Sequence, residues 1–268
     1  MKKALAVLFH IGLNCLQLVS NMKYMGSKDK ISKEIKEIID LNRTSSKQAY
    51  VEPMCGGCNM IDKMKGKRIA GDNNKYLIAL WKGLQLDLKR PYEIPKDLYN
   101  KAKKDYKNGT NTNFNDFLIG WIGFMASFNG KFFDAGYGGI TEKRNYIDEQ
   151  IRNTEAQIKN IKGIDFYFTD YQNLLIPENS IIYFDIPYFD STKYTTNTFD
   201  YPIFYDFAEL KSKQGHKVFI SEYWMPEERF TKVWQKQVKS NLSTRTQTKI
   251  ECLFIPKNQI INQNATLF

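Results

Sequence analysis

A carboxylate, a proline and an aromatic ring stand together in Asp185-Ile186-Pro187-Tyr188, directly after the apolar segment 180–184. Such a segment is typical of a buried β-strand, and ligands of open α/β sheets bind beyond the carboxyl ends of the strands. The carboxylate and a neighbouring backbone carbonyl can accept both N–H bonds of a planar amine, while the ring stacks on the base that carries it. Taken alone, the tetrapeptide also fits an ordinary turn at a strand end.

A second set of residues suits a nucleoside. Segment 52–59 (Glu-Pro-Met-Cys-Gly-Gly-Cys-Asn), called the Gly-rich turn below, follows a short expected strand, and its glycines let the backbone approach a ligand closely. Twenty residues after Glu52, Asp72 ends the next expected strand, where its carboxylate can accept hydrogen bonds from both ribose hydroxyls of an adenosine. The turn has no Lys-Ser/Thr pair for phosphates, which favours a nucleoside over NAD or ATP. The alternative is a structural turn and an ordinary surface aspartate.

Cys55 and Cys58 also form a C-x-x-C pattern, which is compatible with a redox dithiol or half of a metal site. The chain has four cysteines and two histidines, and the histidines are far from this pair in sequence. We therefore expect the two small side chains to line the turn, and we expect no metal site. A secreted thiol oxidoreductase is the alternative.

Composition favours a nucleic-acid partner. The 268 residues include 39 Lys and Arg against 29 Asp and Glu, a formal net charge of +10, and 14% are aromatic. A basic surplus suits a polyanion, although it also occurs in proteins that are merely soluble and basic. A hydrophobic content of 42% excludes global disorder, and the length predicts one large domain or one domain with a subdomain.

The elements that must position these residues follow from periodicity and breakers. We expect helices at 27–41, 60–65, 77–84, 142–162 and 204–213, and strands at 49–51, 68–71, 166–168, 181–184, 217–220 and 250–255. Residues 22–88 and 164–256 then form one α/β domain, interrupted by a Lys-rich and aromatic insert at 89–163 and followed by a tail at 257–268. Residues 1–21 have the basic and apolar parts of a secretory signal. We favour instead an upstream extension with Met22 as the true start.

In sequence, these motifs resemble the Dam-type family of DNA adenine-N6 methyltransferases, in a form like those of bacteriophages and prophages. Segment 23–28 (Lys-Tyr-Met-Gly-Ser-Lys) looks like the family's first motif, and 51–58 is similar to its Val-Glu-Pro-Phe-x-Gly-Gly-Gly cofactor loop. Segment 72–74 matches its Asp-x-Asn, and 185–188, followed by 192–194, corresponds to its catalytic Asp-Pro-Pro-Tyr. Segments 215–223 and 251–254 also look like family segments.

The resemblance implies a Rossmann-like, class I sheet that uses S-adenosylmethionine, with an inserted, mainly helical DNA-recognition subdomain. It implies these catalytic residues: Asp185, Ile186, Pro187 and Tyr188. It implies these cofactor-binding residues: Tyr24, Lys28, Glu52, Pro53, Gly56, Gly57, Asp72, Asp170 and Asp185. For DNA contacts, the insert offers Lys104, on a run of lysines that could equally be a solvated helix face, and Asn129, Lys131 and Tyr137, on an aromatic, glycine-containing loop.

Two residues depart from the family pattern. Ile186 replaces its first proline, and Cys58 replaces its third glycine, a position that would be strained if it needs a positive φ. We expect an active, site-specific DNA adenine-N6 methyltransferase that is monomeric, binds double-stranded DNA and no membrane, and works in the cytoplasm of a bacterial or phage-infected cell, in a restriction-modification setting. A catalytically impaired DNA-binding relative and an RNA methyltransferase are the alternatives.

Overall fold

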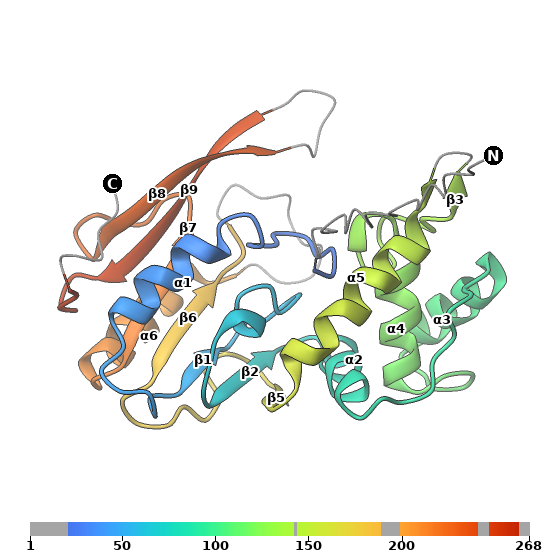
Figure 1. The fold of residues 1–268 in the computed structure, drawn as a ribbon, viewed down its shortest axis with the longest axis horizontal. Helices are drawn as coiled ribbons and strands as arrows, with labels where there is room; N and C mark the ends of the chain where they lie inside the picture. Colours follow the sequence, from blue (N-terminus) through green and yellow to red (C-terminus); the bar gives the residue numbers. More distant parts are fainter. Residues whose placement is uncertain (1–20, 142–143, 189–198, 241–246, 263–268) are drawn as a thin grey trace, which may run out of the picture.

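The structure is a computed structural model that describes residues 21–141, 144–188, 199–240 and 247–262 (Figure 1). The expectations for residues 1–20 and for segment 192–194 lie outside the described residues. The helices are α1 (Ser32–Leu41), α2 (Lys75–Gln85), α3 (Lys96–Asn108), α4 (Asp116–Ala126), α5 (Tyr146–Ile161) and α6 (Tyr201–Lys213), with short 3-10 turns η1 (Ile61–Lys63) and η2 (Phe128–Gly130).

A seven-stranded sheet forms the frame of the protein, in the order β5-β2-β1-β6-β7-β9-β8. Its strands are β1 (Tyr50–Glu52), β2 (Arg68–Asp72), β5 (Ile164–Phe168), β6 (Ile181–Asp185), β7 (Lys217–Glu222), β8 (Phe230–Ser240) and β9 (Gln247–Pro256). The first five in this spatial order from β5 to β7 are parallel, and β9 is antiparallel to both β7 and β8. The expected α/β class is confirmed, and the carboxyl ends of β2, β1 and β6 meet at one edge.

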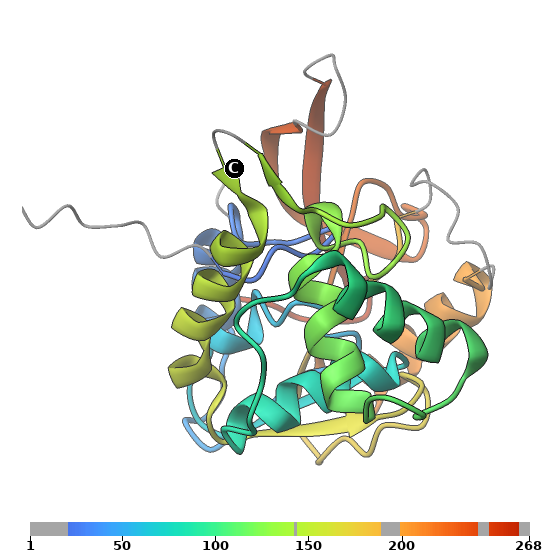
Figure 2. The same cartoon turned by 90° about the vertical axis from the view of Figure 1, so that its right-hand side faces the viewer.

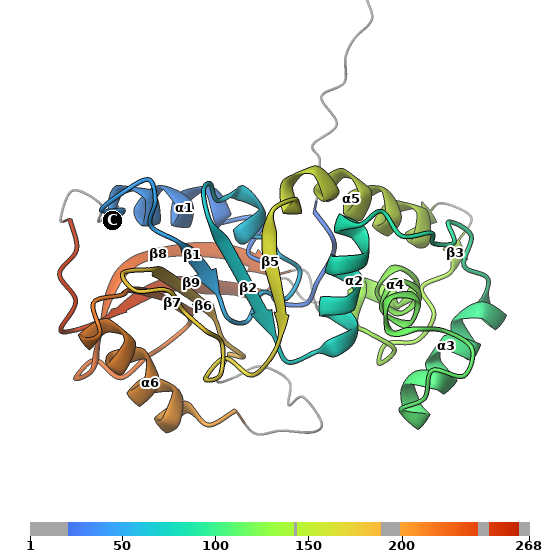
Figure 3. The same ribbon diagram turned by 90° about the horizontal axis from the view of Figure 1, so that it is seen from below.

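Alternate residues of the central strands face two different layers, as strand geometry requires. Tyr183 of β6 and Phe219 of β7 belong to the core that contains the isoleucines of α1, whereas Phe184 and Ile220 belong to the core under α6. Figure 3 shows α1 and α6 on opposite sides of the sheet. The sheet is therefore covered on both faces, and open space for a ligand is left to the ends of its strands.

The chain between β2 and β5 forms a helical region beside the β5 edge, which faces the viewer in Figure 2. Its centre is α4, in which every residue except Asp116 and Leu118 is buried. Helices α2, α3 and α5 pack around α4, and a small hairpin of β3 (Ile140–Thr141) and β4 (Arg144–Asn145) precedes α5. Residues of α4 share one apolar cluster with sheet residues such as Tyr50, so the region is built onto the sheet rather than around a core of its own.

The observed elements differ from the expected ones in several places, among them α3 and α4, which no expected helix covers, and α5, which begins at Tyr146 rather than at 142. Segment 230–240 is the long strand β8, which periodicity did not predict; segment 60–65 is only a 3-10 turn; and α1 begins at Ser32 rather than at 27. In the expected tail, the Gln259 side chain exchanges two hydrogen bonds with the backbone of Val218, so this part of the tail is attached to β7. Within the described ranges, no helix combines the length and apolar character needed to cross a bilayer.

Candidate active site

Asp72 is held at the end of β2 by the Gly-rich turn. Its carboxylate accepts hydrogen bonds from the backbone N–H groups of Gly56 (3.1 Å) and Asn74 (2.9 Å). A carboxylate has about four acceptor positions, so two remain to receive hydroxyl groups. Burial raises the pKa of Asp72 to about 6, and the two backbone hydrogen bonds oppose this rise.

The turn itself is fixed by Tyr24 and Trp81. The Trp81 indole N–H donates to the Gly56 carbonyl at 3.0 Å. Tyr24 packs so closely that a Cβ atom on Gly56 would lie 2.7 Å from its ring, and one on Gly57 would lie 2.6 Å from its Cβ. Gly56 also has φ +45°, in the left-handed region that favours glycine. These contacts explain why both glycines are required here.

The two cysteines of the turn are buried. Burial raises the pKa of Cys55 and raises that of Cys58 further, which disfavours the thiolate that a redox dithiol needs. Cys58 adopts φ +56°, so the position where the family pattern has its third glycine has a left-handed backbone in this chain. Across the described residues, His, Cys, Asp and Glu form no cluster of three suited to a metal ion.

At the end of β6, Asp185 meets a cation from the segment that precedes α1. The Lys28 ammonium lies 2.7 Å from Asp185 Oδ1 and also donates to the Gly26 carbonyl at 2.7 Å. The Lys28 side chain is only 4% exposed, whereas that of Asp185 is 24% exposed. Burial raises the pKa of Asp185, Lys28 lowers it, and the charge of Glu251 raises it again. Lys28 therefore favours the ionised carboxylate at a position where burial opposes it.

Tyr188 lies against the same cation. Its ring centroid is 4.5 Å from Lys28 Nζ, and its hydroxyl donates to Glu251 Oε2 at 2.6 Å. The ring also makes an edge contact with Tyr223, with 4.3 Å between centroids. The two ends of segment 185–188 thus bring a carboxylate and an aromatic ring together around one lysine.

The two residues between them are anchored from the α6 side. Ile186 is 3% exposed and lies in the apolar cluster under α6, which explains why isoleucine is compatible with a position where the family has proline. The Pro187 carbonyl accepts a hydrogen bond from the Tyr201 hydroxyl at 2.7 Å. These contacts restrain the turn although the first proline is absent.

Glu52, Pro53 and Asp170 lie near the same sheet edge. Glu52 is 2% exposed, and burial, followed by the charges of Asp185 and Asp62, raises its pKa well above the usual range. Pro53 is buried beside Gly71 of β2. Asp170 is exposed after β5, and its loop is joined to β2 by a 3.1 Å hydrogen bond from the Thr169 N–H to the Asp72 carbonyl. Glu52 is therefore an internal group in this structure, whereas Asp170 is open to solvent.

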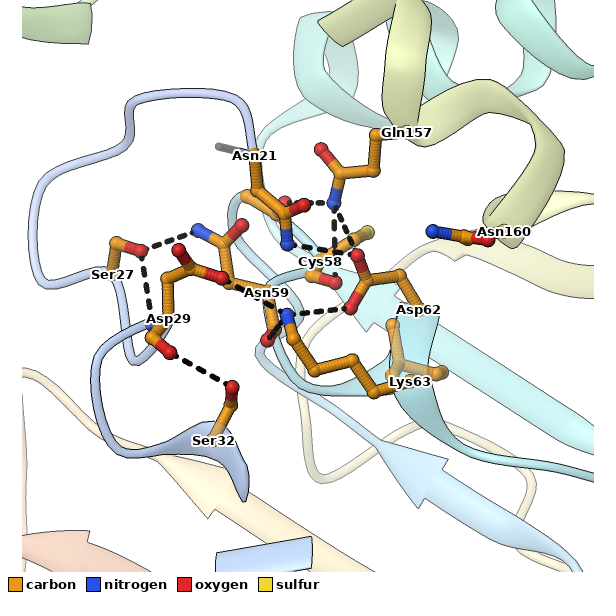
Figure 4. A network of polar contacts seen from close by, with 12 residues as sticks. Asn21, Ser27, Asp29, Ser32, Cys58, Asn59, Asp62, Lys63, Gln157 and Asn160 are labelled. Carbon is orange, nitrogen blue, oxygen red and sulfur yellow. Dashed lines mark hydrogen bonds and ion pairs between the residues drawn. The ribbon is translucent and has the colours of Figure 1, made fainter. Parts of the chain in front are cut away.

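Two glutamines of α5 connect the helical region to the Gly-rich turn and to the segment that precedes α1. Gln157 donates to the carbonyls of Gly57 (3.1 Å) and Cys58 (3.3 Å), and also to Asp62. Figure 4 shows this network, which continues through Asn21, Asn59 and Lys63. Gln150 bonds both the N–H and the carbonyl of Lys23, next to Tyr24. Sequence reasoning did not find these buried amides, because they lie in a polar helical stretch with no motif.

The residues predicted to contact DNA are not equally available. Lys104 is exposed on α3, Asn129 is exposed with φ +54°, and Lys131 is partly exposed. Tyr137 donates its hydroxyl to the Ile94 carbonyl at 2.6 Å, and its ring packs against Tyr99. The structure thus gives Tyr137 a role in packing, and its contact with DNA stays a prediction.

The phenylalanine rings of the aromatic loop differ in how far they are buried. Phe133 is 2% exposed, and Phe132 packs between Phe124 and Tyr106. Both rings pack in the apolar cluster that α4 shares with the sheet, whereas Phe128 is 40% exposed. Of these three rings, Phe128 is the most exposed, Phe132 is partly exposed and Phe133 is buried.

Sequence reasoning did not include Tyr223 or Glu251 in the site. Both lie in segments that resemble the family, but nothing in their spacing connects them with Tyr188. The sheet order brings them there, because it places β7 beside β6 and β9 beside β7.

Comparison with known proteins supports this site in part. Residues 24–119 match the family model of D12 class N6 adenine-specific DNA methyltransferases. The matched stretch contains Tyr24, Lys28, the Gly-rich turn and Asp72, and it ends before segment 185–188. The resemblance to adenine-N6 DNA methyltransferases is thus confirmed over this stretch. Among curated proteins, no sequence matches the chain.

Proposed function

We propose that this protein transfers a methyl group from S-adenosylmethionine to the N6 amino group of adenine in double-stranded DNA. The observation that carries the proposal is the pairing of Asp185 with Lys28 beside Tyr188, at the same sheet edge as Asp72. Strands β2 and β6 are separated only by β1, so their ends are about 10 Å apart. A nucleoside bound at one carboxylate can therefore meet a base bound at the other.

The donor set fits the cofactor. Asp72 would accept the ribose hydroxyls, Gly56 and Gly57 would let the backbone approach the nucleoside, and Tyr24 and Lys28 would line the side toward the methionine part. Glu52 and Pro53 would support the turn from within, and Asp170 would close the site beside Asp72. When bound, S-adenosylmethionine supplies an electrophilic methyl group on a sulfonium.

The target amine would be oriented by segment 185–188. Adenine in a duplex hides its amino group, so the base must leave the helix, which costs a few kcal/mol. Tyr188 would stack on the extruded base, while the Asp185 carboxylate and the Ile186 carbonyl accept its two N–H bonds. Because Lys28 favours the ionised form of Asp185, a negative charge would face the nitrogen as positive charge develops on it. No cysteine is needed as a nucleophile in this direct transfer.

The helical region would hold the duplex. Exposed lysines of α3, among them Lys104, suit contacts with phosphates, and Asn129 and Lys131 would approach the bases. Phe128 offers an exposed ring on the same loop. Gln157 ties this region to the Gly-rich turn and Gln150 ties it to Lys23, which supports a single site built from both parts.

A transfer assay with product identification tests the proposal. The protein is incubated with S-adenosylmethionine labelled in its methyl group and with unmethylated genomic duplex DNA, and the nucleosides are separated after digestion. We expect label in N6-methyldeoxyadenosine. Label in a methylated cytosine, or in RNA supplied in parallel but not in DNA, would contradict the proposed target, and no label in any nucleic acid would leave the DNA-binding alternative.

A further inference from the structure

Tyr188 is held from a strand far away in the sequence. Its hydroxyl donates to Glu251 Oε2 at 2.6 Å, across 63 positions of the chain. The distance of 2.6 Å between the two oxygen atoms lies in the range of a short, charge-assisted O–H···O⁻ hydrogen bond. Such bonds are roughly twice as strong as bonds between neutral groups. The contact therefore constrains the end of the ring opposite its backbone.

The sheet explains how Glu251 reaches this position. β7 lies between β6 and β9, with Asp185 opposite Ser221 and Glu222 opposite Cys252. Side chains alternate along a strand. Leu253 belongs to the α1-side core, so Glu251, two residues away, shares that face, as Asp185 shares it with Tyr183. The two carboxylates thus project on the same side of the sheet edge.

Further contacts complete the setting of the ring. Tyr223 touches Tyr188 edge-on, and Lys249 Nζ lies 4.7 Å from the centroid of Tyr223. Burial, followed by the charges of Asp185 and Glu251, raises the pKa of Tyr188 well above its usual range, so the hydroxyl keeps the proton that it donates. The ring is part of a set of contacts supplied mainly by β7 and β9.

We infer that Glu251 is a positioning residue that fixes the Tyr188 ring in the orientation needed to stack on the extruded adenine. This role rests on the proposed function, since it assigns the holder of the stacking ring in that reaction. A ring that is already immobilised loses less conformational freedom when the base arrives, and it orients the amine better for transfer. The effect of Glu251 passes through the Tyr188 hydroxyl and not through the cofactor.

The test compares Glu251→Ala, Glu251→Gln, Tyr188→Phe and the double variant Glu251→Ala/Tyr188→Phe with the wild-type protein. Glu228→Ala is the charge-matched control, because Glu228 is an exposed glutamate in the turn before β8. Each protein is assayed for kcat and KM on unmethylated genomic duplex DNA, and for the Kd of S-adenosylmethionine by calorimetry. Thermal unfolding checks that all variants are folded.

We expect Glu251→Ala to lower kcat about 10- to 100-fold, the range for losing a hydrogen bond to a charged group, with cofactor Kd unchanged. Glu251→Gln should recover most of kcat, because its amide oxygen accepts the same bond. Tyr188→Phe should match Glu251→Ala, and the double variant should be no slower than either. Glu228→Ala should behave as wild type.

The inference would be overturned, with the proposed function left intact, if Glu251→Ala kept the wild-type kcat. The same holds if the losses multiply in the double variant, or if Glu251→Gln is as slow as Glu251→Ala. An equal loss in Glu228→Ala would overturn it too, because a general charge effect would then suffice. A wild-type protein that methylates no DNA would overturn both the proposed function and this role.

Discussion

The ends of β2 and β6 each place an acidic side chain at the same sheet edge, but the two carboxylates have different partners. Asp72 is held by backbone N–H groups of Gly56 and Asn74, whereas Asp185 meets the ammonium of Lys28. Burial raises the pKa of both. Backbone dipoles thus hold the carboxylate at the end of β2, whereas the full charge of Lys28 faces the carboxylate at the end of β6.

The difference suits two kinds of ligand group. Backbone dipoles orient Asp72 but leave its pKa at about 6, which is sufficient for accepting hydrogen bonds from neutral hydroxyls. A nitrogen that gains positive charge during methylation needs a dependable negative charge beside it. Lys28 supplies the electrostatic support for that charge at Asp185. Altering the partner at each end should therefore impair different steps.

Among changes that leave Asp185 itself in place, the largest effect is expected from Lys28→Met, which keeps much of the side-chain length and removes the cation. Without Lys28, burial and the neighbouring Glu251 both favour the protonated form of Asp185. We expect kcat to fall about 100-fold or more, with a smaller change in cofactor affinity, measured by steady-state kinetics and calorimetry.

Lys30→Ala, a change at an exposed lysine two residues away, serves as the control and should retain wild-type kcat. If Lys28→Met instead loses cofactor affinity while keeping its kcat, Lys28 serves the cofactor alone and the contrast between the two strand ends is wrong.

A smaller effect, on a different step, is expected from Asp72→Asn. The amide loses the charge that strengthens hydrogen bonds with the ribose hydroxyls, so the Kd of S-adenosylmethionine should rise about 10- to 100-fold. At saturating cofactor, kcat should stay within a few-fold of wild type. Asp165→Asn, on the exposed side of neighbouring β5, is the matched control. A large loss of kcat in Asp72→Asn with an unchanged Kd would contradict the role of Asp72 in cofactor binding.

The smallest effect is a pH dependence. Ribose hydroxyls bind the ionised Asp72, so cofactor affinity should fall as the pH drops through about 6, by at most tenfold per unit. The stability of the free protein changes with pH in the opposite direction. Because the pKa of Asp72 is raised in the folded state, its carboxyl lowers the free energy of unfolding as the pH rises from about 4 to 6. Calorimetry from pH 7.5 to 5 should show the affinity loss in wild type and a flat profile in Asp72→Asn; equal slopes would exclude Asp72 as its source.

Much of the sheet could be predicted because its parallel strands are short apolar runs with polar residues at their ends. Asp72 and Asp185 were found in this way, and the structure brings both to one edge. Strand β8 was not predicted, because residues such as Lys232, Gln235 and Lys236 keep it polar on its exposed positions. Pairing with β9 stabilises β8, although the sequence of β8 alone does not indicate a strand.

The rest of the site depends on contacts between distant parts of the chain. Nothing local in the sequence indicates that Lys28 reaches Asp185 or that Glu251 reaches Tyr188, because each contact joins segments that are far apart in the chain. The burial of Phe133 has a similar origin, because an aromatic residue of a loop gives no sign of burial until the helices that cover it are placed. Residue types therefore predicted which side chains belong to the site, whereas the contacts between these side chains depend on the three-dimensional fold.

The most direct test of the central claim is sequencing of modified adenines in DNA from cells that express either the wild-type protein or Asp185→Ala. The wild-type protein should produce N6-methyladenine at one recurring short sequence, and Asp185→Ala should reduce it by several orders of magnitude while still binding S-adenosylmethionine. Equal methylation by the two proteins, or no N6-methyladenine from the wild type, would contradict the account.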